Sequence, residues 1–172
     1  MPQHRRAQRL RRTSMKNGVT NIIIAGLGGQ GVLRASGIVA DTAFRAGLDV
    51  KQSELHGMSQ RGGSVSSDVR FGREVFSPMV PAGEADFLVV VAPDQVEVNR
   101  HQLREGGILI GPDAIAANKL MNKKSLNVAL LGVLSRHLEI SEEHWLEAIR
   151  AAFSEKLQEA NLQAFALGRN GA

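Results

Sequence analysis

The sequence predicts an α/β fold, a Rossmann-like three-layer arrangement with a mainly parallel sheet, an appended antiparallel hairpin and C-terminal helices. Three observations support this prediction. Short apolar runs alternate with segments of helical spacing, a glycine-rich turn separates the first run from the first helical segment, and the last part of the chain is helical throughout. The length of 172 residues is about that of one domain.

The first strand and helix are the clearest elements. Residues 21–25, Asn-Ile-Ile-Ile-Ala, are apolar on both faces, which is typical of a strand buried in a parallel sheet. Val32 begins a run of small and apolar residues at helical spacing, and Gly47 closes it as a C-terminal cap. Residues 48–53 predict a second strand, which would complete a right-handed βαβ unit, and residues 53–63 predict a loop.

A hairpin is predicted next. Val65, Val69 and Phe71 alternate with polar residues, as in a strand that is solvated on one face. Gly72-Arg73 fits a two-residue turn, after which residues 74–77 would return antiparallel.

Two more strands and a set of helices follow. Residues 86–92 form the most apolar run, Asp94 is positioned to cap a helix that reaches about Leu103, and Gly106-Gly107 predicts a turn into a strand at 108–110. Three C-terminal helices are predicted at residues 127–138, after a cap at Ser141, and at 154–168.

Composition limits the function classes. The chain has no cysteine, which excludes disulfides, thiolate zinc sites, a cysteine nucleophile and an iron-sulfur cluster held by its own thiolates. The net charge of +4 comes from an arginine-rich start, and the rest of the chain is mildly acidic, so no nucleic-acid partner is expected. We expect residues 1–18 to be a disordered basic extension and residues 19–172 to be a single domain. No segment is long and apolar enough for a membrane span or a secretory signal, so the expected compartment is the cytoplasm.

The glycine-rich turn is the first candidate site. In AGLGGQGVLRASG, residues 25–37, the residues Gly26, Gly28 and Gly31 satisfy GxGxxG between a strand and a helix. Glycines there let backbone N–H groups approach an anion beside the positive end of the helix. Glu54 is the only acidic residue near the place where a dinucleotide ribose would be held, and its spacing is poor. Phosphate contact and simple tight packing of strand and helix therefore both remain open.

The second candidate site is the loop SELHGMSQRGG, residues 53–63. It should leave the carboxyl end of the second strand, where α/β sheets bind ligands. His56 can transfer a proton and Arg61 can bind a phosphate or carboxylate, so these two are the catalytic candidates, although each alone is more often a solvated surface residue. The chain lacks tyrosine and a GxSxG motif and has no predicted metal site, so independent catalysis is not expected.

These segments carry a family resemblance. GLGGQGV at 26–32, SELHGMSQRGGSVSSDVRFG at 53–72 and FSPMVPAGEAD at 76–86 resemble the gamma subunit or domain of the 2-oxoacid:ferredoxin oxidoreductases, especially the indolepyruvate group and its beta subunit. The resemblance covers residues 20–168, including NVALLG at 127–132, whereas residues 112–126 look shorter than in the family.

The resemblance implies a subunit of an enzyme that oxidatively decarboxylates a 2-oxoacid, such as an arylpyruvate, to an acyl-CoA and passes electrons to ferredoxin. It implies that a larger partner subunit holds thiamine diphosphate and the iron-sulfur clusters, that coenzyme A is the co-substrate, and that this chain is inactive alone. By matching motif, the cofactor-binding turn would comprise Gly26, Gly28, Gly29, Gln30 and Gly31. The substrate or partner loop would comprise His56, Gly57, Met58, Gln60, Arg61, Gly62 and Gly63.

Two other functions compete with this interpretation. One is a free-standing NAD(P)- or nucleotide-binding Rossmann module that uses the glycine turn. The other is a nucleic-acid-binding adaptor that uses the basic N-terminal arm.

Overall fold

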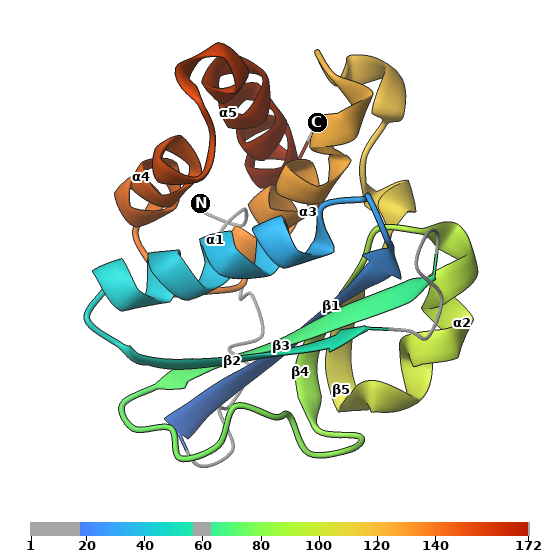
Figure 1. Ribbon diagram of the computed structural model, residues 1–172, viewed down its shortest axis with the longest axis vertical. Helices are drawn as coiled ribbons and strands as arrows, with labels where there is room; N and C mark the ends of the chain where they lie inside the picture. Colours follow the sequence, from blue (N-terminus) through green and yellow to red (C-terminus); the bar gives the residue numbers. More distant parts are fainter. Residues whose placement is uncertain (1–17, 57–62, 172) are drawn as a thin grey trace, which may run out of the picture.

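A computed structural model describes residues 18–56 and 63–171 as a five-stranded sheet with most of its helices packed on one face (Figure 1) and the short helix α2 (Val96–Asn99) on the other. Only Gly18 of the expected N-terminal extension belongs to the described residues. The strands are β1 (Val19–Leu27), β2 (Asp49–His56), β3 (Ser64–Gly72), β4 (Ala85–Val90) and β5 (Leu103–Ile110). The helices are α1 (Val32–Arg45), α2 (Val96–Asn99), α3 (Leu126–Ser135), α4 (Glu142–Ala152) and α5 (Glu155–Asn170), joined in places by short 3-10 turns.

The strand order is β2-β3-β1-β4-β5. β1 pairs in parallel with β4, and β4 pairs in parallel with β5, whereas β3 is antiparallel to both β1 and β2. Two antiparallel steps leave β2 pointing the same way as β1, so four of the five strands share one direction. The α/β fold with a mainly parallel sheet is confirmed.

The predicted position of the hairpin is wrong. β3, the predicted first strand of that hairpin, pairs with all of β2 and lies between β2 and β1, so this strand belongs to the main sheet and not to an appended hairpin. β2 also runs on to His56, three residues beyond the predicted end at Ser53. As a central strand, β3 forms backbone hydrogen bonds with a neighbouring strand on each side. Its alternating sequence pattern does not indicate this central position.

The β1 side chains divide the interior into two parts. Ile22 and Ile24 point into the larger core with α1, α3, α4 and α5, and Ile23 points into a smaller cluster with Leu88 and Val90. Burial on both faces confirms the prediction for this strand. α4 packs on α1 and α5 packs on α3, so these two helices form an outer layer above α1 and α3 (Figure 1).

The predicted turn at Gly72-Arg73 and the strand at 74–77 are wrong. Gly72 is the last residue of β3, and a Cβ atom there would overlap the carbonyl of Gly18, just before the neighbouring strand β1. Glycine is therefore needed for close approach of two backbones and not for a turn. Residues 73–84 form an irregular connection to β4.

The segment after β4 also differs from the prediction. Asp94 lies inside a 3-10 turn that begins at Pro93 and does not cap a helix, and α2 has only four residues. Gly106 and Gly107 lie within β5, where Gly106 has a φ of 75° beside a register irregularity. These glycines therefore belong to a β-bulge. The C-terminal helices match their predicted positions, and Ser141 is the N-cap residue of α4 but makes no side-chain cap bond.

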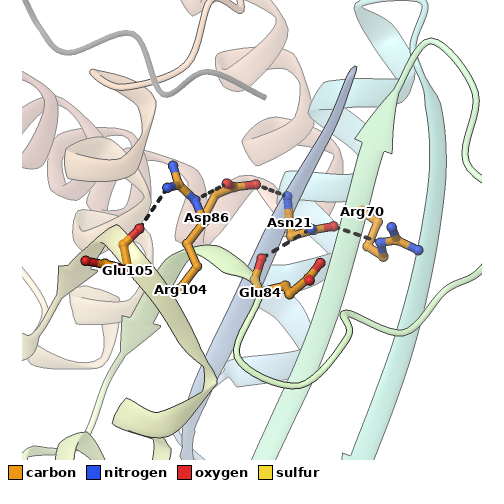
Figure 2. A network of polar contacts seen from close by, with 6 residues as sticks. All are labelled: Asn21, Arg70, Glu84, Asp86, Arg104 and Glu105. Carbon is orange, nitrogen blue, oxygen red and sulfur yellow. Dashed lines mark hydrogen bonds and ion pairs between the residues drawn. The ribbon is translucent and has the colours of Figure 1, made fainter. Parts of the chain in front are cut away.

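A polar network ties four strands together at the start of β1 (Figure 2). Asp86, whose side chain is 4% exposed, accepts hydrogen bonds from the Asn21 backbone N at 2.8 Å and from Arg104 Nε at 2.6 Å. Asn21 in turn donates to the Glu84 carbonyl at 3.2 Å and accepts from Arg70 Nε at 2.8 Å. The buried carboxylate is thereby both paired and hydrogen-bonded, as a buried charge requires.

In the part of the chain that the structure describes, no helix combines the length and the apolar character needed to cross a membrane.

Candidate functional site

The glycine turn joins β1 to α1, and its glycines have distinct roles. Gly29 and Gly31 have φ values of 86° and 75°, in the left-handed region that favours glycine. At Gly26 the φ is ordinary, but a Cβ atom would lie 2.9 Å from Gln30 Oε1 and 2.9 Å from Val32 Cγ2. Close packing therefore accounts for Gly26, whereas backbone conformation accounts for Gly29 and Gly31.

Hydrogen bonds close this turn and join it to the second predicted segment. Gln30 Oε1 accepts from the Leu27 backbone N at 2.7 Å, and the Gln30 backbone N donates to the Leu27 carbonyl at 3.2 Å. The Gly28 backbone N donates to the Gly63 carbonyl at 2.9 Å. The structure thus brings the glycine turn together with the last residue of the predicted loop.

The rest of that loop is described only in part. The backbone of His56 ends β2, where it pairs with Val65. The predicted site residues Gly57, Met58, Gln60, Arg61 and Gly62 lie outside the described residues.

A cavity of about 420 Å³ borders the glycine turn. It lies beyond the carboxyl ends of the neighbouring parallel strands β1 and β4, the position at which open α/β sheets bind ligands. Its described lining is Gly29, Gln30, Gly31, Arg34, Val91, Asn122, Lys123, Lys124, Ser125, Leu126, Asn127, Phe153, Leu157 and Asn161. This lining contains three cationic side chains and no carboxylate.

The N-terminus of α1 adds to the positive character of the cavity. The N-cap residue is Gly31, no side chain caps the helix, and its first turn contains no acidic residue. The first backbone N–H groups of a helix lack intrahelical partners and carry a partial positive charge. Together with Arg34, Lys123 and Lys124, this end of α1 favours an anion such as a phosphate group.

Arg34 is oriented by the turn between α4 and α5. Its guanidinium lies 5.1 Å from the centre of the Phe153 ring and donates to the Ala152 carbonyl. A cation over an aromatic face is held by the ring's negative charge distribution. Arg34 therefore stays at the cavity wall although it is exposed.

Asn127, on α3, carries an unused hydrogen-bond acceptor at the cavity. The residue is 5% exposed, and its Nδ2 donates to the Gly31 carbonyl at 3.1 Å. Its Oδ1 is buried and accepts no hydrogen bond from any described residue. Through its Nδ2, Asn127 therefore joins α3 to the N-terminus of α1 at the cavity wall.

Sequence reasoning missed most of this lining. Lys123 and Lys124 lie in a stretch without strand or helix periodicity, and they meet the glycine turn only through the fold. The available signals were the paired lysines before a helix and the lack of acidic residues at the start of α1. Among the described residues, no group of three His, Asp or Glu side chains is arranged to hold a metal ion.

Comparisons with known proteins agree with this architecture. The family model for pyruvate ferredoxin/flavodoxin oxidoreductase matches residues 21–171. Indolepyruvate oxidoreductase subunit IorB of Thermococcus kodakarensis is 34% identical, over 86% of this chain and 93% of that protein. The gamma subunit of a keto/oxoacid ferredoxin oxidoreductase from Geobacter sulfurreducens PCA has a TM-score of 0.75 at 24% identity, over 89% of this chain and 98% of that one.

A further solved structure has the same fold within a longer chain. The 2-oxoglutarate:ferredoxin oxidoreductase from Magnetococcus marinus, with 2-oxoglutarate, coenzyme A and succinyl-CoA bound, has a TM-score of 0.75 at 22% identity. The match covers 91% of this chain but 31% of that one. At this identity the likeness concerns the fold.

Proposed function

Because the chain belongs to the pyruvate ferredoxin/flavodoxin oxidoreductase family, we propose that it is the non-thiamine subunit of a 2-oxoacid ferredoxin oxidoreductase that acts on an arylpyruvate such as indolepyruvate. The complete enzyme cleaves the 2-oxoacid to CO2 and joins the acyl group to the thiol of coenzyme A. The two electrons released pass singly to two ferredoxins. With ferredoxin as the acceptor, we expect the enzyme to work in the cytoplasm.

The division of labour follows from the donor groups that this chain offers. Thiamine diphosphate supplies the electron sink for decarboxylation, and iron-sulfur clusters carry the electrons away. Clusters of this kind need thiolate ligands, and the 172 residues contain no cysteine. We therefore assign the iron-sulfur clusters to a larger partner subunit. We propose, from the family alone, that the same subunit holds thiamine diphosphate and that this chain is inactive alone.

The proposed task of this chain is to receive coenzyme A. The single observation that carries this proposal is the cavity at the N-terminus of α1, with three cationic side chains and no carboxylate in its described lining. Coenzyme A is polyanionic through its pyrophosphate and its ribose phosphate, so such a wall attracts it. An acidic side chain here would repel it.

Each wall residue has a distinct proposed role. Backbone N–H groups around Gly29 and Gly31 can approach the pyrophosphate because glycine has no side chain of its own to hold the ligand away. Lys123 and Lys124, both exposed, draw the charged end of the molecule in from solvent. Asn127 holds the glycine turn in place, because its Nδ2 donates to the Gly31 carbonyl.

Indolepyruvate is the preferred substrate in this proposal because IorB is 34% identical over most of both chains. The pocket that selects the 2-oxoacid would lie mainly on the partner subunit, close to the thiamine. The loop with the catalytic candidates His56 and Arg61, which adjoins the glycine turn through Gly63, would face that pocket.

Isolation of the complex tests this function. An affinity tag on this chain should retain, from its native cells, a larger cysteine-rich chain and an activity that reduces ferredoxin when indolepyruvate, thiamine diphosphate and coenzyme A are all present. Omission of coenzyme A or replacement of indolepyruvate by pyruvate serves as the control. If the tagged chain is monomeric and binds NAD or NADP by itself, the proposal is wrong and the free-standing nucleotide-binding module is favoured.

A further inference from the structure

The connection between β3 and β4, residues 73–84, exposes two large apolar side chains. Phe76 is 86% exposed and Met79 is 52% exposed. The connection begins beside Val19, at the start of β1, so it lies at the opposite end of the sheet from the glycine turn. Figure 1 shows it as the green loop along the lower edge of the molecule.

The backbone of this connection is held by side chains of two strands and by its own buried valines. Val75 and Val80, which flank the exposed pair, are almost completely buried. The hydrogen bonds run from the Val75 backbone N to Asp49 Oδ2 (2.8 Å), from the Val80 backbone N to Asp68 Oδ2 (2.9 Å) and from Arg70 Nη1 to the Ser77 carbonyl (2.8 Å). Phe76 therefore projects from a segment fixed on both sides.

A fixed, exposed phenylalanine has the properties of a binding anchor. Aromatic side chains dominate protein interfaces, and a segment already held in place loses little conformational entropy on binding. We propose that Phe76 and Met79 form an anchor that inserts into an apolar pocket on the larger, thiamine-binding subunit. This inference rests on the proposed function, since it names the partner that the function requires.

A second copy of this chain fits the anchor poorly. A twofold dimer brings the same patch of both copies together, and two convex anchors cannot fill one another. The cavity of a second copy is lined by Arg34, Lys123 and Lys124, and an anchor that filled it would remove these charged groups from water. If only one anchor were inserted, a free anchor and a free cavity would remain at the two ends of the assembly.

The larger subunit is the better occupant. The same fold makes up 31% of the longer Magnetococcus marinus chain, so it occurs as one part of a larger enzyme whose remaining residues are available to cover its surface. A stable interface buries about 800 Å² on each partner, several times the area of one phenylalanine. The anchor is therefore the centre of a wider contact.

The test uses the complex isolated through a tag on this chain. Phe76→Ala should raise the dissociation constant for the larger subunit by about 30-fold or more, the loss typical of an interface hot spot. Binding is measured by biolayer interferometry, and activity is followed as the complex is diluted. Phe44→Ala is the matched control, because Phe44 is 72% exposed on α1, outside the connection.

The possible outcomes separate the two proposals. Selective weakening by Phe76→Ala, with an unchanged melting temperature of the isolated chain, supports the anchor. Equal affinities of wild type and Phe76→Ala, or equal losses for Phe76→Ala and Phe44→Ala, would overturn the anchor and leave the proposed function intact. A wild-type chain that retains no thiamine-dependent enzyme would overturn both. Conversion of a homodimer to a monomer by Phe76→Ala would show that the occupant is a second copy.

Discussion

Replacement of Gly31 by alanine is the sharpest test of the glycine turn. Gly31 caps α1 with a φ of 75°, and an added Cβ atom would overlap Nδ2 of Asn127. Gly31→Ala must therefore adopt a conformation that L-residues disfavour and must also push Asn127 away from the Gly31 carbonyl.

The cost of Gly31→Ala follows from these two effects. The left-handed conformation costs an alanine about 1–2 kcal/mol. Loss of the hydrogen bond from Asn127 Nδ2 adds about 1 kcal/mol. We expect the free energy of unfolding to fall by about 2–3 kcal/mol, which leaves a domain of ordinary stability folded.

Urea denaturation followed by circular dichroism measures this cost, with Gly37→Ala as the control. Gly37 lies inside α1, and nothing lies within 4 Å of an added Cβ atom. Alanine is the better helix former there, so this variant should gain about 0.5–1 kcal/mol. The two substitutions in one helix should thus have opposite signs. If Gly31→Ala is as stable as the wild type, the reasoning about the turn is wrong.

Two further predictions concern buried carboxylates. Arg104→Met should lower the free energy of unfolding by about 2–3 kcal/mol, because it leaves Asp86 buried without its ion pair. The double variant Arg104→Met with Asp86→Asn should lose less stability than the sum of the losses of the two single variants. Additive losses in urea denaturation would contradict this prediction. Burial raises the pKa of Asp68 above its ordinary value of 3.8, although the hydrogen bond from the Val80 backbone N opposes the shift. The native state then binds this proton more tightly than the unfolded chain does, so the Asp68 contribution to stability falls as pH rises from about 3.8 through the raised pKa. Asp68→Asn should remove that decline, so the free energy of unfolding of the variant should rise relative to that of the wild type as pH increases over this window. A difference that does not change with pH would refute the assignment.

The sequence predicted the elements that are determined locally. The run of isoleucines in β1, the helical spacing from Val32 and the close of α1 at Gly47 each depend on neighbouring residues, and each agrees with the structure. The glycine turn was located for the same reason.

The errors concern interactions between distant residues. The alternation at 64–72 does not reveal that β3 lies between β2 and β1, because either pairing suits the same pattern. The apparent turn at Gly72-Arg73 suggested a returning strand at 74–77, but the Val75 backbone N donates to the carboxylate of Asp49, far earlier in the chain. When the backbone N–H groups of a segment donate to side chains and not to a neighbouring strand, the sequence pattern of that segment does not show it.

The candidate site likewise combines local features that the sequence predicts with contacts between distant residues that it does not. The glycines were found from spacing, whereas Lys123 and Asn127 reach the turn from more than 90 positions away, as the contact of Asn127 with Gly31 shows. Lys123 belongs to no short motif, and the segment NVALLG that begins at Asn127 does not indicate a contact with Gly31, so only the packing of α3 beside α1 joins these residues to the cavity.

The most direct test of the account is the Michaelis constant for coenzyme A in the complete enzyme that contains Lys123→Ala and Lys124→Ala. Removal of two of the three cations in the described part of the cavity lining should raise the KM for coenzyme A by about tenfold and leave the KM for the 2-oxoacid unchanged. Lys119→Ala, an exposed lysine of the same segment outside the cavity lining, should alter neither constant. An unchanged KM for coenzyme A in the double variant would contradict the proposal that this chain receives coenzyme A.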